Sequence, residues 1–380
     1  MRLTGAWVIV GMAMMLAGCS RPSAELPRRG DEIIVCGRFF HTGAPVVLWI
    51  DPGGYDAYRT EKRFAPWGKS AFAALAKGAD GPASPNRYGV RFAPAAPGAS
   101  TTTEEGAAEI AAELDAPSRL TPDEFERIRG GGWDLPLLQQ KVDQFVLHYD
   151  VAGTSRQCFR TLHDVRGLSV HFMLDLDGTI YQTMDVKERA WHATIANDRS
   201  VGVEIANIGA YPDDGSPNPL SKWYSTDESG IAPQARITLP ATIGDGGIRT
   251  PGFIGRPARP LPVIGEVQGK TYRQYDFTPE QYASLEKLTA TLHAVLPRIA
   301  LDYPRDANGR LVTRALSKDE WSRFHGVLGH FHIQQNKIDP GPAMQWDALI
   351  NGARRLSGEY SPGSRATPSV YDSPDPSRAY

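Results

Sequence analysis

The segment SVHFMLDLDGTIYQ, residues 169–182, carries the pattern that decides the fold of this chain of 380 residues. Apolar residues recur at every second position from Val170 to Leu174, which is the period of a β-strand with two unlike faces. The pair Asp177-Gly178 is the strongest short signal for a hairpin turn, and residues 179–182 supply the returning strand. The segment therefore predicts two paired strands.

Further elements are predicted on either side of this hairpin. Residues 145–147 form a buried apolar strand that ends at His148, and residues 155–165 form a helix. In residues 201–206 the apolar residues alternate again, and Glu204 lies on the opposite face between a glycine and an alanine. A carboxylate with such small neighbours leaves room for a ligand beside it.

One helix outside this block has a complete start signal. Thr278 is placed to cap it, Pro279 stands at its first position, and Gln281 completes a capping box. Phe277 can pack against Tyr282 across the cap. Weaker patterns predict strands at 33–36 and 46–50, and helices at 104–114, 121–130 and 346–356.

Residues 31–356 are expected to form one catalytic domain with an N-terminal extension. Within it, residues 209–275 hold many glycines and prolines and little periodicity, which indicates an irregular covering insertion. Residues 357–380 are rich in Ser, Pro, Gly and Arg and are expected to be disordered. The charges balance, with 41 Lys and Arg against 43 Asp and Glu, so the basic excess of a nucleic-acid-binding protein is missing.

The N-terminus reads as a targeting signal. Residues 1–18 combine an early arginine with a short apolar run, and Leu16-Ala17-Gly18-Cys19 resembles the lipobox of bacterial lipoproteins. The resemblance implies lipidation of Cys19, a tether at 19–30, and an outer-membrane location facing the periplasm. An ordinary secretory signal is the alternative. Cys36 and Cys158 then remain, and they can pair or stay as free thiols.

The segment GHFHIQQNKIDPGP, residues 329–342, concentrates side chains that bind metals. It holds two histidines, one aspartate and one lysine before a Pro-Gly-Pro that cannot continue a helix. Imidazole nitrogen and carboxylate oxygen are ligands that zinc accepts. Alone, the segment also fits a polar helix end.

Five motifs in order carry a family resemblance. They are FVLH at 145–148, the hairpin at 170–182, AWHA at 190–193, SVGVEI at 200–205, and residues 329–342. Together they resemble the zinc-dependent N-acetylmuramoyl-L-alanine amidases, relatives of phage amidases and animal peptidoglycan recognition proteins. The resemblance covers residues 140–210 and 277–350. It implies an α+β fold in which a central mixed β-sheet is flanked by helices.

The resemblance also implies the site. It makes His148, His330 and Asp339 the ligands of one zinc ion, with a fourth position left for water or substrate. It makes Glu204 the general base and Lys337 the group that stabilises the oxyanion. Trp191 and His192 match the edge of a pocket near the muramic acid.

The chain departs from the family in one respect that concerns the ligands. The spacing from His330 to Asp339 is one residue shorter than in the cytosolic recycling enzymes, so His332 is a competing ligand. His171 is either a support for the site or a satisfied core histidine. The remaining histidines, at positions 41, 163, 293 and 325, are expected to be structural or exposed.

The expected function is hydrolysis of the amide between the lactyl group of N-acetylmuramic acid and L-alanine of the stem peptide. Peptidoglycan or muropeptides are the expected partners. A lipoprotein that binds peptidoglycan without cutting it is the main alternative, and a zinc peptidase that cuts within the stem peptide is another. The binder is disfavoured because such proteins typically lose a metal ligand, whereas this chain keeps the three ligands, Glu204 and Lys337.

Lipidation of Cys19 predicts that the protein partitions with membranes, because several acyl chains together anchor a protein stably. Cys19→Ala combined with a cleavable signal is expected to release it as soluble protein, which fractionation and immunoblotting measure. A native protein found wholly in the soluble fraction would contradict the anchor.

Overall fold

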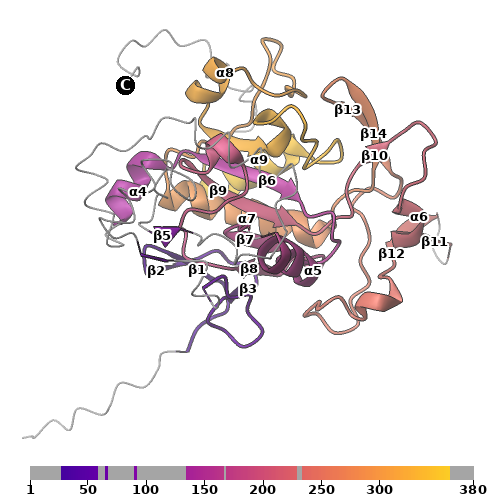
Figure 1. Ribbon diagram of the computed structural model, residues 1–380, viewed down its shortest axis with the longest axis horizontal. Coiled ribbons are helices and arrows are strands. Elements are labelled where there is room, and N and C mark those ends of the chain that lie inside the picture. The colour runs from indigo at the N-terminus through magenta and orange to yellow at the C-terminus, as the bar shows by residue number, and fades with distance from the viewer. Residues whose placement is uncertain are drawn as a thin grey trace, which may run out of the picture.

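The computed structural model describes residues 27–58, 65–66, 90–91, 134–166, 168–228 and 233–359. Its centre is a six-stranded mixed sheet with the order β15-β6-β9-β7-β8-β3 (Figure 1). Strands β15, β6, β9 and β7 are parallel, β8 is antiparallel to β7, and β3 is parallel to β8. The strands are β3 (Val46–Leu48), β6 (Gln144–Tyr149), β7 (Phe172–Leu174), β8 (Ile180–Gln182), β9 (Ser200–Ile205) and β15 (Gly326–Gly329).

Helices flank this sheet, so the predicted α+β fold is confirmed. They are α4 (Leu135–Lys141), α5 (Ser155–Phe159), which continues as the π-helix η1 (Arg160–Val165), η2 (Thr194–Ala196), α7 (Pro279–Val295), α8 (Lys318–Arg323), η4 (His330–His332) and α9 (Trp346–Ser357). Helix α7 has the predicted capping box at Thr278. The rings of Phe277 and Tyr282 pack edge to face across it at 5.9 Å.

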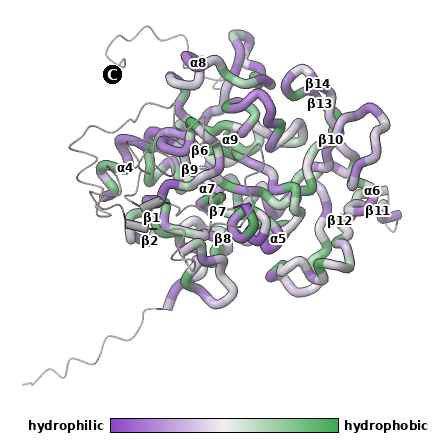
Figure 2. The backbone as a smooth tube through the Cα atoms, in the orientation of Figure 1, coloured by the Kyte–Doolittle hydropathy of each residue, from purple (hydrophilic) through white to green (hydrophobic). Residues whose placement is uncertain are grey.

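The two faces of the central strands have different neighbours. Because successive side chains of a strand point to opposite faces, Phe145 and Leu147 of β6 face one way and His148 the other. The first face packs on α7 and α9 in the main hydrophobic core. Figure 2 shows hydrophobic segments gathered in the centre of the molecule. Burying each large apolar side chain stabilises the fold by roughly 1.5–3 kcal/mol, so this face contributes most to holding the sheet. The other face packs smaller apolar clusters around Val146 and Met173 and also carries His148.

The N-terminal extension forms a small antiparallel sheet of β1 (Glu32–Val35) and β2 (Arg38–His41). It is tied to β8 by Gln182, whose side chain both donates to the carbonyl and accepts from the N–H of Ile34, each at 2.7 Å. The strand pair β4 (Ala65–Pro66) and β5 (Val90–Arg91) completes the described part of this region. The strands predicted at 33–36 and 46–50 are thus confirmed with shifted ends.

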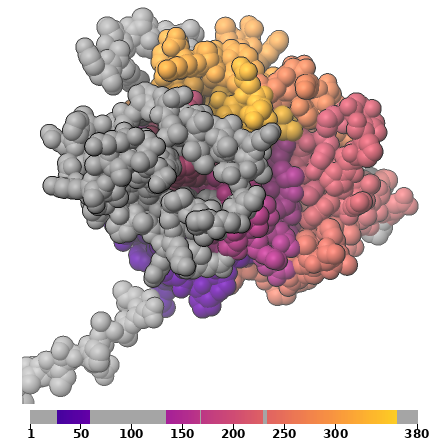
Figure 3. All heavy atoms as spheres, viewed as in Figure 1, coloured from indigo at the N-terminus to yellow at the C-terminus, as the bar shows by residue number. Residues whose placement is uncertain are grey.

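The prediction that residues 209–275 are irregular was wrong. They form a three-stranded and a two-stranded antiparallel sheet, and Figure 3 shows the segment along one side of the molecule. Their strands are two to five residues long and largely exposed, so they carry little of the alternation that marks a strand in sequence. The elements are β10 (Tyr211–Pro212), α6 (Leu220–Trp223), β11 (Tyr224–Asp227), β12 (Gln234–Ile237), η3 (Ala241–Ile243), β13 (Val263–Val267) and β14 (Lys270–Gln274).

The structure decides the prediction about the cysteines, whereas several other predictions concern residues that it does not describe. Cys36 and Cys158 do not form a disulfide with each other, so of the two alternatives pairing is excluded. The signal at 1–18, most of the tether, the helices at 104–114 and 121–130, and the tail beyond 359 lie outside the described residues. Among the helices that are described, none has the length and apolar character to cross a membrane.

A buried ion pair lies at the amino ends of three neighbouring strands, β15, β6 and β9. Arg199, just before β9, and Asp143, just before β6, are both fully buried and form two parallel hydrogen bonds of 2.5 and 2.7 Å. Arg199 also donates to the Phe324 carbonyl, and His325 bonds the same carboxylate beside the start of β15. Burial alone would raise the pKa of Asp143, but His325 and Arg199 outweigh it and lower the pKa to about 2.

Arg199→Met is expected to lower the free energy of unfolding by about 3–5 kcal/mol, because it leaves a buried carboxylate without its partner. Arg298→Met is the matched control. That guanidinium reaches the same carboxylate at 3.4 Å with a side chain that is 48% exposed, so its loss should cost less than about 1 kcal/mol. Chemical denaturation measures both.

The pH dependence of the difference in unfolding free energy between the parent and Arg199→Met tests whether the ion pair with Asp143 causes it. The folded-state pKa of Asp143 lies below the ordinary value of 3.8, so the ionised carboxylate stabilises the fold above that value and this contribution is lost as the pH falls toward about 2. The difference in unfolding free energy between the parent and Arg199→Met should therefore become smaller at acidic pH. Equal losses for the two arginine variants at neutral pH would contradict the account.

Candidate metal centre

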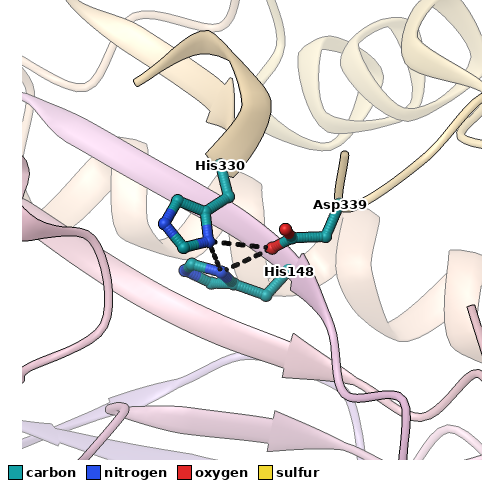
Figure 4. A group of neighbouring side chains, drawn as sticks. All are labelled: His148, His330 and Asp339. Atoms are coloured by element: carbon teal, nitrogen blue, oxygen red, sulfur yellow. Dashed lines mark hydrogen bonds and ion pairs between the residues drawn. The ribbon is translucent and has the colours of Figure 1, made fainter. Parts of the chain in front are cut away.

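Three buried side chains from separate elements meet at one point (Figure 4). His148 stands on β6, His330 begins η4, and Asp339 lies on the loop that follows. The Nδ1 atoms of the two histidines are 3.0 Å apart, and Oδ2 of Asp339 is 2.8 Å from the first and 3.1 Å from the second. The side chains that the sequence predicts as ligands are therefore brought together.

The donor set fits one zinc ion. His330 Nε2 hydrogen-bonds to the side-chain oxygen of Gln334, which fixes the proton on that nitrogen and leaves the Nδ1 lone pair free. Burial works against ionisation of Asp339, yet the two imidazoles hold its pKa well below the usual range. Two imidazole nitrogens and one carboxylate oxygen form the three-ligand set of a catalytic zinc site with one position open.

A second group of possible ligands in the described residues fits a metal less well. Asp31, Glu32 and His41 also lie close together, with His41 exposed. However, Glu32 already accepts backbone hydrogen bonds from residues 29–31 and an ion pair from Arg28. Its carboxylate is thus satisfied by the protein, whereas the contacts of Asp339 Oδ2 within the described residues are with the two imidazoles.

His192 contacts the second ring nitrogen of His148, a predicted ligand. Its Nδ1 lies 2.9 Å from His148 Nε2, and its Nε2 lies 3.2 Å from the Ser200 hydroxyl. This contact needs Gly202, because a Cβ at that position would stand 2.5 Å from the His192 ring. The small residue beside Glu204 therefore makes room for an imidazole of the protein itself.

The other residue of the predicted pocket edge, Trp191, is only 8% exposed. The Arg189 guanidinium lies over its ring at 5.0 Å, and its backbone N–H donates to the Ser169 hydroxyl. A role for Trp191 and His192 in contacting substrate remains a prediction.

Glu204 stands beside the predicted ligands. In the parallel pairing of β6 and β9 it is the partner of His148, so the two side chains share one face of the sheet. Its Oε2 is buried and bonds to no side chain or backbone group of the described residues. Burial and the neighbouring Asp339 carboxylate raise the pKa of Glu204 to about 8. A group that exchanges its proton near neutrality suits general acid–base work.

Lys337 brings a positive charge to this face. It lies half-buried on the loop between His330 and Asp339, and its backbone N–H donates to the Gln334 carbonyl. Its charge lowers the pKa of Glu204, partly offsetting burial. The predicted base and the predicted oxyanion-stabilising group are thus coupled through space.

His332 is not available as a competing ligand. Its Nδ1 accepts the Gly329 N–H at 2.9 Å and its Nε2 donates to the Val312 carbonyl at 2.7 Å. Burial lowers the pKa of this imidazole to about 3. Both ring nitrogens are therefore occupied by hydrogen bonds to backbone groups, and neither is left to bind a metal.

His171 is a satisfied core histidine, the alternative that the sequence left open. It bonds the Glu188 carbonyl and accepts the Gly202 N–H. Sequence reasoning missed Gln334, although its place four residues after His330, about one helical turn, was a usable signal.

Several solved structures align with part of this chain. Three solved structures have TM-scores of 0.27–0.30 to this chain and each alignment covers 56% of it. A selenomethionine AmpD derivative is 17% identical over 86% of its own chain. AmiD from E. coli, solved with anhydro-N-acetylmuramic acid-L-Ala-D-gamma-Glu-L-Lys, is 20% identical over 57% of its chain. The endolysin LysCS from Clostridium intestinale is 15% identical over 83%.

No curated protein matches the chain significantly in sequence. The family model of N-acetylmuramoyl-L-alanine amidases matches residues 138–239, a range that includes His148, His192 and Glu204. Within that range the chain is similar to the N-acetylmuramoyl-L-alanine amidase family.

Proposed function

We propose that this protein is a zinc-dependent N-acetylmuramoyl-L-alanine amidase, which hydrolyses the amide between the lactyl group of N-acetylmuramic acid and L-alanine. The observation that carries the proposal is the convergence of His148, His330 and Asp339 with Glu204 on the same face. The family model matches only residues 138–239. His330, Lys337 and Asp339 lie beyond that range, so their convergence with its residues is independent support.

Each residue has a distinct task in this reaction. Bound zinc would supply Lewis acidity, which polarises the scissile carbonyl and lowers the pKa of a water molecule. Glu204 takes the proton of the attacking water and returns it to the leaving amine of L-alanine. The Lys337 ammonium stabilises the negative charge that develops on the carbonyl oxygen. His192 keeps the His148 ring in the orientation that points Nδ1 inward.

The proposal extends to the substrate and to the place of action. Peptidoglycan or its muropeptides are the substrate class, and the lipid anchor at Cys19 would hold the enzyme at the outer membrane, facing the periplasm. A binding lipoprotein without activity has less support, since such a protein has no use for a poised acid–base group such as Glu204 beside the ligands.

The purified protein is expected to bind about one zinc ion per chain, and His330→Ala is expected to lose most of it. His41→Ala is the matched control, because that histidine belongs to the less suitable ligand group. Metal analysis after dialysis measures the content. Full zinc content in a His148→Ala, His330→Ala double variant would contradict the ligand assignment.

Glu204→Gln is expected to retain zinc and muropeptide binding while kcat falls by roughly 10²–10⁴-fold, the contribution of a positioned acid–base group. Lys337→Met should lower kcat by roughly 10²–10³-fold for the loss of one oxyanion partner. Release of free stem peptide from a muropeptide gives the rates, with Glu280→Gln, an exposed residue in the first turn of helix α7, as control. Near-normal turnover by zinc-loaded Glu204→Gln would place the base elsewhere.

A further inference from the structure

The tip of the β13–β14 hairpin has an unusual residue in its turn. Val267 pairs with Lys270, so Gln268 and Gly269 form a two-residue turn, with positive φ angles of 53° and 71°. Such turns favour Asn-Gly or Gly-Gly, because few side chains tolerate positive φ. A glutamine in the first position breaks this preference, which points to a task for its side chain.

That side chain reaches into the loop that bears the proposed metal ligands. Gln268 Nε2 donates to the carbonyl of Phe331 at 2.8 Å and to that of Gln334 at 3.0 Å. Phe331 follows His330 directly, and its own N–H donates to the Asp339 carbonyl at 3.1 Å. One amide group therefore holds the backbone between the two ligands that this loop supplies.

The hairpin is itself fixed where it makes these contacts. The Gln268 side-chain oxygen accepts the Ala315 N–H at 3.0 Å, and its backbone N–H donates to the Thr313 carbonyl at 2.8 Å. The donor is thus preorganised before it meets the loop, which lowers the entropy lost in ordering the loop.

A second glutamine of the same hairpin holds the far end of the loop. Gln274, fully buried, donates to the Pro340 carbonyl and accepts the Ala343 N–H, both at 3.0 Å. Its side chain passes so close to Gly341 that a Cβ there would lie 2.2 Å from the amide oxygen. The hairpin therefore contacts the backbone on both sides of Asp339.

We propose that Gln268 is a positioning residue, through which residues 209–275 hold His330 and Asp339 at the separation that zinc needs. This inference rests on the proposed zinc site and gives the insertion a role in metal binding.

The variant Gln268→Asn distinguishes the positioning of the loop by the side chain from the formation of the two-residue turn. Asparagine suits the positive φ and keeps the amide, but its side chain is one methylene too short for the Phe331 and Gln334 carbonyls. Zinc affinity is expected to fall by about 10–100-fold, the usual effect of removing a partner that orients metal ligands. Thermal unfolding of the zinc-free protein should show that the variant still folds, because the better turn residue opposes the loss of the side-chain hydrogen bonds.

Gln139→Asn is the matched control, since Gln139 is also half-buried and donates to one carbonyl, that of Val295, far from the loop. It should keep the parent's zinc affinity. Competition with a chromogenic chelator measures affinity without any need for turnover. Parent-like zinc affinity in Gln268→Asn, or a parent that binds no zinc, would overturn the inference. A parent that binds zinc but releases no peptide would refute only the proposed amidase activity.

Discussion

The site depends on keeping three electron-rich atoms within about 3 Å of one another inside the protein. Lone pairs on His148, His330 and Asp339 repel each other unless a proton or a cation lies between them, and burial strengthens that repulsion. The fold must therefore impose the arrangement through groups that do not themselves bind metal. Gln334 and His192 do so for the two rings, and the hairpin glutamines do so for the loop.

Different parts of the central sheet provide stability and carry the site. The amino ends of β6, β9 and β15 are fastened by the buried pair of Asp143 and Arg199, while His148 and Glu204 lie further along β6 and β9. Because α7 and α9 bury the opposite face in the main core, the face of His148 and Glu204 needs only smaller apolar clusters and has room for polar side chains. Gly202 lets that face accommodate the imidazole of His192, which supports a proposed ligand, and still leaves Glu204 beside the proposed metal centre.

The sequence predicted the elements that depend on interactions between residues close together in the chain. Strand alternation around Phe172, the hairpin at Asp177-Gly178 and the capping box at Thr278 all appear in the structure. The proposed ligands were identified by motif resemblance, and the structure brings them together. The role of Gln268 was beyond sequence reasoning, because its partners are 63 and 66 residues away in the chain. The strands of 209–275 were missed because they are too short and exposed to show a period, and His171 could not be told from a support for the site until its ring partners were known.

The most direct test of the account is the identity of the products. Zinc-loaded protein is incubated with a muropeptide of known structure, and the products are identified by mass spectrometry, with a metal-free sample alongside. The account predicts an intact stem peptide with a free L-alanine amino group and a muramic acid with a free lactyl carboxyl group, formed only with metal. Cleavage within the stem peptide, or an unchanged muropeptide that is merely bound, would contradict it.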